Sequence, residues 1–329
     1  MSGKNDEALN MAEEFLSRSR ASRETVPLMM AHRVMGSTLL TVGEFELSRQ
    51  HFDESIARSK RKDKRSLYNL YMVEPRAASL LLSSWDLWFL GYPDQALSRV
   101  VDALALARDL EQPYTIAFAY YMTSVVHLLR GEPELALASA EESLRMSREQ
   151  RFSLYVILSI ISRGRALGGL GQLREAKLEI QLGLDEARSK GVGFMLPMMN
   201  SWLADMHARS GKNETALSIV EQVLANIGDV TGRSWESELR RQKGQLFLAL
   251  DPARASQAES CFKEALEVAR HQKAKSLELR AATSLAALWE TQGRFSEARG
   301  LIAPIYGWFN EGTDTEDLRR ARAAQISLT

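Results

Sequence analysis

The sequence predicts an all-α protein, a right-handed superhelical solenoid in which helix pairs of about 40 residues are stacked in a row. Two observations predict it. A glycine followed five residues later by a small residue recurs at a nearly constant interval, and between the glycines the apolar residues keep helical spacing, as in Ala96, Val100, Leu104 and Ala107. The recurring pairs are Gly3/Ala8, Gly43/Ser48, Gly91/Ala96, Gly131/Ala136, Gly171/Ala176, Gly211/Ala216 and Gly293/Ala298.

Each repeat carries the signals that end one helix and begin the next, as in "GYPDQAL" (91–97) and "GEPELAL" (131–137). The glycine ends the first helix, and Pro93, Pro133 and Pro252 suit the first turn of the second helix, where no intrahelical hydrogen bond is lost. The small residue lets the two helices approach closely. Larger residues four positions later are expected to fill the layer between neighbours, namely Phe52, Val100, Ile180, Val220 and Phe262.

The repeats predict one continuous array over 1–329 rather than two globular domains, since each unit contacts mainly its neighbours. Between Gly211 and Gly293 the missing unit is supplied by Asp251-Pro252 with a longer turn. The expected units are a half-repeat at 1–20, helix pairs at 22–62, 72–110, 113–150, 153–190, 193–228, 232–272 and 274–310, and a capping helix at 313–329.

The two ends of the array carry separate expectations. Gly3/Ala8 lies one period before Gly43/Ser48, so residues 5–20 are expected to be the second helix of a unit whose first helix is missing. Either the array continues upstream in a longer protein, or this helix is a terminal cap. At the other end a capping box from Thr313 to Glu316 predicts a final helix, with Arg319, Arg320 and Arg322 on a solubilising face.

Composition excludes several classes of function. Lys+Arg and Asp+Glu are equal at 42 each, so no overall basic field favours nucleic acid or an anionic membrane as the partner. Cys261 is the single cysteine and cannot form an internal disulfide, and no signal-like segment begins the chain. We therefore expect a cytoplasmic protein that binds neither nucleic acid nor membrane.

Motifs for chemistry are missing from the sequence. There is no G-x-x-x-x-G-K-[ST] phosphate loop and no His or Cys pair with ligand spacing, so neither a cofactor, a metal nor a catalytic residue is expected. His127 and His207 occupy the same position in different repeats, which favours packing. The basic run from Lys60 to Arg65 is expected to be a solvated loop, with docking to an acidic partner surface as the alternative.

Three segments resemble a known family: "LWFLGYPDQAL" (87–97), "GRSWESELRRQKGQLFL" (232–248) and "AKSLELRAATSLAALWETQGRFSEARGLIAPIYGWFNEGTDTEDL" (274–318). They are similar to the C-terminal tetratricopeptide-like (TPR-like) arrays of bacterial signalling proteins that carry an adenylate/guanylate cyclase domain and a regulatory ATPase module. A looser similarity is to the sugar-sensing repeat domain of the maltose-regulon activator. The resemblance spans about residues 32–320 and implies a regulatory or interaction arm without catalytic residues. Glu74-Pro75-Arg76 departs from the D-P-G turn of that family.

The concave face of the solenoid is the candidate binding surface, because arrays of this kind bind along the first helices of their pairs. Arginines beside aromatic rings suit a peptide with acidic and apolar side chains, or a sugar. The alternatives are that the tryptophans pack between helices, that the arginines are ordinary surface, and that Glu238 pairs with Arg241. The repeat register places on this face Arg33, Trp85, Trp88, Tyr121, Arg165, Asp205, Arg209, Glu238, Arg241 and Arg280.

The sequence thus predicts a non-catalytic array that binds a protein or peptide partner, or the upstream domains of its own polypeptide, along the concave groove. The alternative is a sensor that binds a small molecule such as a sugar or metabolite and changes the shape of the superhelix. The identity of the partner, the oligomeric state and the regulated output are not encoded in these patterns.

Overall fold

The computed structural model describes residues 3–22, 24–59, 72–193, 195–227 and 232–328, and within these ranges it contains helices and turns but no strand. The predicted all-α class is therefore confirmed. The α-helices are α1 Gly3–Ser22, α2 Thr25–Val42, α3 Phe45–Arg58, α5 Pro75–Phe89, α6 Pro93–Asp109, α7 Pro113–Arg130, α8 Pro133–Glu149, α9 Ser153–Gly169, α10 Leu173–Ser189, α11 Leu196–Arg209, α12 Asn213–Asn226, α13 Glu236–Leu250, α14 Ala255–His271, α15 Lys275–Thr291, α16 Phe295–Tyr306 and α17 Glu316–Ser327. Short 3₁₀ turns, η1 Arg233–Trp235 and η2 Pro252–Arg254, precede α13 and α14.

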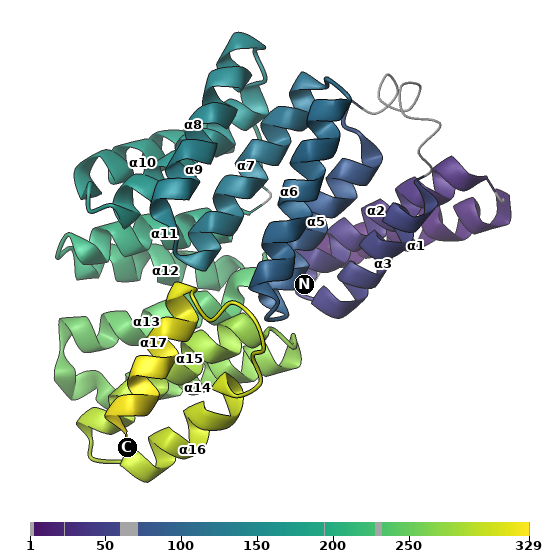
Figure 1. The fold of residues 1–329 in the computed structure, drawn as a ribbon. Coiled ribbons are helices and arrows are strands. Elements are labelled where there is room, and N and C mark those ends of the chain that lie inside the picture. The colour runs from purple at the N-terminus through teal and green to yellow at the C-terminus, as the bar shows by residue number, and fades with distance from the viewer. Residues whose placement is uncertain (1–2, 23, 60–71, 194, 228–231, 329) are drawn as a thin grey trace.

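Consecutive helices pack against each other along the whole array, from α1 on α2 to α16 on α17. In Figure 1 the chain curves steadily from the purple N-terminal helices through the teal helices to the yellow α17, as a superhelical solenoid does. The first helices of the pairs, such as α7, α9, α11, α13 and α15, contact one another along the inner side. The predicted solenoid of TPR-like helix pairs is confirmed.

The turn between the two helices of a pair follows the sequence signals. Gly131 ends α7 in the left-handed region at φ 80°, and its N–H donates to the carbonyls of His127 and Leu128. Pro133 then begins α8, as predicted. The connection between pairs also uses a left-handed residue, which is a non-glycine at Glu111 (φ 51°), Arg151 (φ 58°) and Lys273 (φ 55°) and a glycine at Gly191 (φ 69°). Glycine spacing therefore marks only one of the two turns in each repeat.

Packing between helices confirms the roles assigned to the small and large residues of the repeat, except at Ala8 on α1, which is half-buried. The small residues are fully buried at 0% exposure: Ser48, Ala96, Ala136, Ala176, Ala216, Ala258 and Ala298. The larger residues four positions on are at most 1% exposed: Phe52, Val100, Ile180, Val220 and Phe262. A larger side chain at the first set of positions would push the two helices of a pair apart.

The superhelix is tight enough that its C-terminal part folds back onto its N-terminal part. α15 contacts α5, and η1 contacts α2. The ring of Trp88 stacks on that of Trp235 at 6.1 Å between centroids, and the Ser276 hydroxyl donates to the Trp88 carbonyl at 2.5 Å. We call this contact surface between α2–α7 and η1–α17 the closure seam. Residues about 150 to 230 positions apart meet there, which a nearest-neighbour solenoid does not predict.

The connection between α16 and α17 completes the closure seam with polar contacts. The carboxylate of Glu311 accepts hydrogen bonds from the backbone N–H groups of Asp94 and Gln95, at 2.9 and 3.1 Å, at the start of α6. The Gly312 N–H donates to the Asp94 carboxylate at 2.9 Å. α17 begins at Glu316 with Thr315 as N-cap, two residues later than the predicted capping box.

Two further expectations concern the segment before α5. The basic run at 60–65 lies outside the described residues. At Glu74-Pro75-Arg76 the structure begins α5 at Pro75, and the Glu74 carboxylate caps this helix by accepting from the Ala77 N–H at 2.6 Å. Separately, among the described helices none combines the length and apolar character needed to cross a membrane.

Candidate functional site

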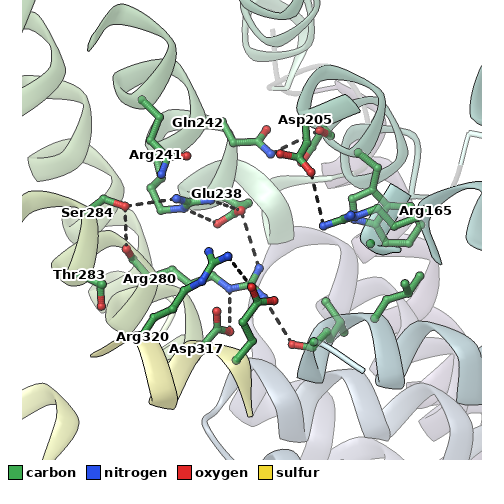
Figure 2. Close-up of a pocket in the computed structure, with 18 of the residues that line it drawn as sticks. Arg165, Asp205, Glu238, Arg241, Gln242, Arg280, Thr283, Ser284, Asp317 and Arg320 are labelled. Carbon is green, nitrogen blue, oxygen red and sulfur yellow. Dashed lines mark hydrogen bonds and ion pairs between the residues drawn. The ribbon is translucent and has the colours of Figure 1, made fainter. Parts of the chain in front are cut away.

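A cavity of about 750 Å³ lies on the inner side of the solenoid, and we call it the inner cavity. α9, α11, α13, α15 and α17 each contribute side chains to it, and the turn between α7 and α8 closes one end (Figure 2). Its charged lining consists of Glu132, Arg165, Asp205, Arg209, Glu238, Arg241, Arg280, Glu316, Asp317, Arg319 and Arg320. An apolar part is formed by Leu128, Leu129, Pro133, Trp202, Trp235 and Ala287.

The structure brings six of the ten predicted groove residues together around the inner cavity: Arg165, Asp205, Arg209, Glu238, Arg241 and Arg280. The repeat register explains why. Arg165 and Asp205 are forty residues apart and therefore occupy the same place on neighbouring inner helices, α9 and α11. In Figure 2 they point toward each other from one side of the cavity, while Glu238 and Arg241 extend from α13 on the other side.

The other four predicted residues do not line the inner cavity. Trp85, Trp88 and Tyr121 are 1%, 2% and 3% exposed, so their rings cannot offer an open face to a ligand. They lie in the main hydrophobic core, because the long inner helices bury two faces and the tryptophans occupy the buried ones. Arg33, on α2, is half-buried away from the cavity. The expected aromatic platform is therefore wrong, and the packing alternative holds for these rings.

α17 contributes residues that the sequence pattern assigned to a solubilising cap. Glu316, Asp317, Arg319 and Arg320 line the inner cavity, so this helix forms a wall of the cavity. The sequence predicted an open groove, but the structure has a cavity of which α17 forms one wall. Trp202 and Trp235 were likewise not predicted, and nothing in the repeat pattern distinguishes them from the other buried tryptophans.

Glu238 and Arg280 form the centre of a buried ion-pair network across the cavity wall. Arg241 donates two hydrogen bonds to the Glu238 carboxylate at 2.7 and 2.9 Å, which realises the predicted pairing of the two, and Arg280 lies 3.7 Å from it. Arg280 also donates to Asp317 at 2.8 Å and to the Leu129 carbonyl at 3.4 Å. One arginine thus connects α15 to α13, α17 and α7.

The network holds Glu238 in its charged form. Burial alone raises the pKa of this carboxyl, but the guanidinium groups of Arg241 and Arg280, with Arg165 farther away, lower its pKa to about 2. The folded pKa therefore lies below the ordinary glutamate value of about 4.3. A carboxylate with a lowered pKa stabilises the fold at pH values above the ordinary glutamate pKa. This contribution to the free energy of unfolding is lost as the pH falls toward 2.

We expect acid to destabilise the wild-type protein between about pH 5 and pH 2 more than it destabilises the variant Glu238→Gln. The difference in the free energy of unfolding is expected to be on the order of 3 kcal/mol at pH 7 and to shrink toward pH 2. Denaturant melts at several pH values measure it. The control is Glu267→Gln. Glu267 is exposed on α14 and forms no ion pair among the described residues. Parallel pH profiles for wild type and Glu238→Gln would contradict the assignment.

Arg165 differs from the other buried arginines of the cavity. Its guanidinium lies 3.5 Å from the Asp205 carboxylate and, within the described part of the chain, donates no hydrogen bond. Burial lowers its pKa, the charge of Asp205 offsets this only in part, and the positive charges of Arg209 and Arg280 lower it further. The site therefore contains a half-buried cation, partly removed from water, whose one ion-pair contact among the described residues is long.

The described residues contain no cluster of side chains that could hold a metal ion. No three His, Cys, Asp or Glu side chains among them converge as metal ligands do. Cys261 is buried, and burial raises the pKa of its thiol, which disfavours the reactive thiolate. His127 lies 2.6 Å from the Glu132 carboxylate, which also accepts from Arg130. The arrangement suits noncovalent recognition of a polar ligand.

The fold defines the class of protein: a TPR-like helical repeat array. No protein-family model matches the chain, and no curated protein matches its sequence. Among solved structures, NprR in complex with its cognate peptide NprX is similar with a TM-score of 0.61 and 13% identity, over 93% of this chain and 84% of that chain.

Two further solved structures share the fold. A Rap protein complexed with Competence and Sporulation Factor has a TM-score of 0.59 and 12% identity, over 97% of this chain and 79% of that chain. Aspartyl phosphate phosphatase F from Bacillus subtilis has a TM-score of 0.54 and 13% identity, over 92% of this chain and 75% of that chain. At these identities the comparison concerns architecture alone.

Proposed function

We propose that the chain is a non-catalytic regulatory array that binds a short peptide segment in the inner cavity. The observation that carries the proposal is the cavity itself, in which charged side chains from five helices surround an apolar wall. A segment bound there contacts α9, α11, α13, α15 and α17 together, so that its binding free energy favours the closed superhelix.

The size and chemistry of the cavity support a short segment rather than a folded domain. Its volume of about 750 Å³ lies within the range of 300–1,000 Å³ found for small-ligand pockets. Leu128, Pro133 and Ala287, which are half-buried or exposed, offer contacts for apolar side chains, and the arginines offer contacts for acidic ones. The peptide complex of NprR, whose fold is similar, is consistent with this use of the architecture.

The segment belongs either to a separate partner or to the polypeptide that carries the array. The resemblance to arrays of bacterial cyclase and ATPase signalling proteins favours the second source, a cytoplasmic output domain restrained through the array. In either case occupation of the cavity couples to the closure seam, because Arg280 lines the cavity and also donates to the Leu129 carbonyl of α7.

A small-molecule sensor is the second candidate, and the cavity volume favours it equally. A metabolite that bridges α13 and α17 would also stabilise the closed superhelix. The two candidates differ in the ligand and not in the site, so one experiment separates them.

The test exposes the purified chain to a pooled library of pentapeptides and, separately, to a pool of common metabolites and sugars. Retained compounds are identified by mass spectrometry after gel filtration, and the rise in Tm is recorded. Ala287→Trp fills the inner cavity from an exposed position on its wall, and we expect it to abolish retention. Ala105→Trp, exposed on the outer helix α6, is the matched control and should retain ligand normally.

Retention of peptides that Ala287→Trp abolishes supports the proposal. Retention of metabolites alone supports the sensor. Retention that both tryptophan variants leave unchanged would mean that the inner cavity is not the binding site.

A further inference from the structure

Two arginines on α9 have similar exposure but different partners. The Arg163 side chain, 29% exposed, faces the outer helix α10 and forms two hydrogen bonds with Glu179, one of them at 2.9 Å. The Arg165 side chain, 26% exposed, faces the inner cavity and has only the 3.5 Å contact with Asp205. Charge-assisted N–H···O bonds of arginine are normally about 2.7–2.9 Å long. The donor fork of Arg165 is therefore largely unused.

The neighbourhood of Arg165 contains a second arginine, Arg209. Arg209 lies one helical turn after Asp205 on α11, so it lines the same part of the cavity. Within the described residues it takes part in no ion pair. Among the described residues Asp205 is the one acid in ion-pair contact with either arginine, and it touches only Arg165, at 3.5 Å, while the charge of Glu316 acts on Arg165 from farther away.

The net charge of the residues that line the cavity is also positive. Six arginines and five acidic residues line the cavity among the described residues, and one of the acids, Glu132, already pairs with the buried Arg130 outside it. Six cations then face four acids, a surplus of two positive charges in a chain whose total charge is zero. Arginines whose hydrogen bonds are incomplete are stabilised when an anion enters and accepts from their unused N–H groups.

We propose that the inner cavity binds a ligand that carries a carboxylate, and that Arg165 and Arg209 bind this carboxylate through their guanidinium groups. The inference rests on the proposed function and specifies its ligand class. The planar fork of Arg165 matches a carboxylate in bidentate geometry, and the remaining part of the ligand contacts the accessible apolar lining at Leu128, Pro133 and Ala287. The carboxylate belongs either to a peptide or to a small organic acid.

The test uses three probes on the full chain: pooled pentapeptides with a free C-terminal carboxylate, the same pool with a C-terminal amide and neutral side chains, and a set of small mono- and dicarboxylic acids. Binding is measured by retention and by the rise in Tm. We expect the free-acid pool to bind and the amidated pool to bind at least tenfold more weakly. Arg165→Met and Arg209→Met should each remove this preference, whereas Arg163→Met should keep it.

Folding of the variants is checked independently. Because Arg165 is partly removed from water and poorly paired, Arg165→Met is expected to leave the Tm unchanged or to raise it. Arg209 is exposed, so its replacement should not affect folding.

Each outcome bears on one of the two proposals. If both peptide pools bind equally and Arg165→Met binds like the wild type, peptide binding stands and the carboxylate inference is wrong. If only the small acids bind, and do so through Arg165, the carboxylate inference stands and the ligand is a metabolite instead of a peptide. If no probe of either class binds, both the proposed function and its ligand class are overturned.

Discussion

Replacement of Trp88 by alanine is expected to open the superhelix as well as to destabilise it. The Trp88 ring stacks on Trp235, meets Phe89 edge-on at 5.2 Å, and has the Arg280 guanidinium 4.8 Å from its centroid. Truncation of a buried tryptophan costs about 3–5 kcal/mol, through lost burial and the void that remains. Here the void lies in the closure seam, so we expect a Tm lower by on the order of 10 °C and a larger radius of gyration in small-angle X-ray scattering.

A second tryptophan separates opening from simple destabilisation. Trp289 is 9% exposed and lies in the core of the last repeats, apart from the core that contains Trp88. Trp289→Ala should lower the Tm but leave the radius of gyration at the wild-type value. An unchanged radius for Trp88→Ala as well would mean that the closure seam is held by its polar contacts alone.

Replacement of Arg280 by methionine is the second change with a large expected effect. It keeps most of the side-chain volume, yet it removes the partner of Asp317, one of the two partners of Glu238 and the donor to the Leu129 carbonyl. Removal of one member of a buried ion pair costs about 3–5 kcal/mol, because the other charge is left unpaired. We expect a loss of this size in denaturant melts, together with weaker docking of α17.

The chain offers a closely matched control for Arg280. Arg294 also lies beside a tryptophan, with its guanidinium 4.5 Å from the Trp289 ring, and also pairs with two acids, Glu259 and Glu297. Its side chain is 31% exposed, against 18% for Arg280, so water screens its pairs more strongly and Arg294→Met should have a smaller effect than Arg280→Met. Adding Asp317→Asn to Arg280→Met should recover part of the loss. If Arg280→Met lowers the free energy of unfolding no more than Arg294→Met does, the ion pairs of Arg280 do not stabilise the fold.

The site could be predicted only in part, for reasons visible in single residues. Arg165 and Asp205 were found because a period of forty residues places them on the same face of neighbouring helices. Trp85 and Trp88 were misassigned because a long inner helix buries two faces, and helical spacing does not show which face meets the cavity. The left-handed turns at Glu111, Arg151 and Lys273 carry no glycine, so no residue type signals them.

Taken by itself, the sequence determined the helix pairs, their ends and the packing layer between them, because these depend on contacts within one repeat and its neighbour. Gly131 and Pro133 act over a few residues, and Ala136 over one helix crossing. Only the tertiary structure decided that Trp88 meets Trp235, that Glu311 caps α6, and that α17 closes the inner cavity. These contacts depend on the total rotation of the superhelix, which is the sum of the small rotations between successive repeats. A local sequence pattern does not determine that total rotation.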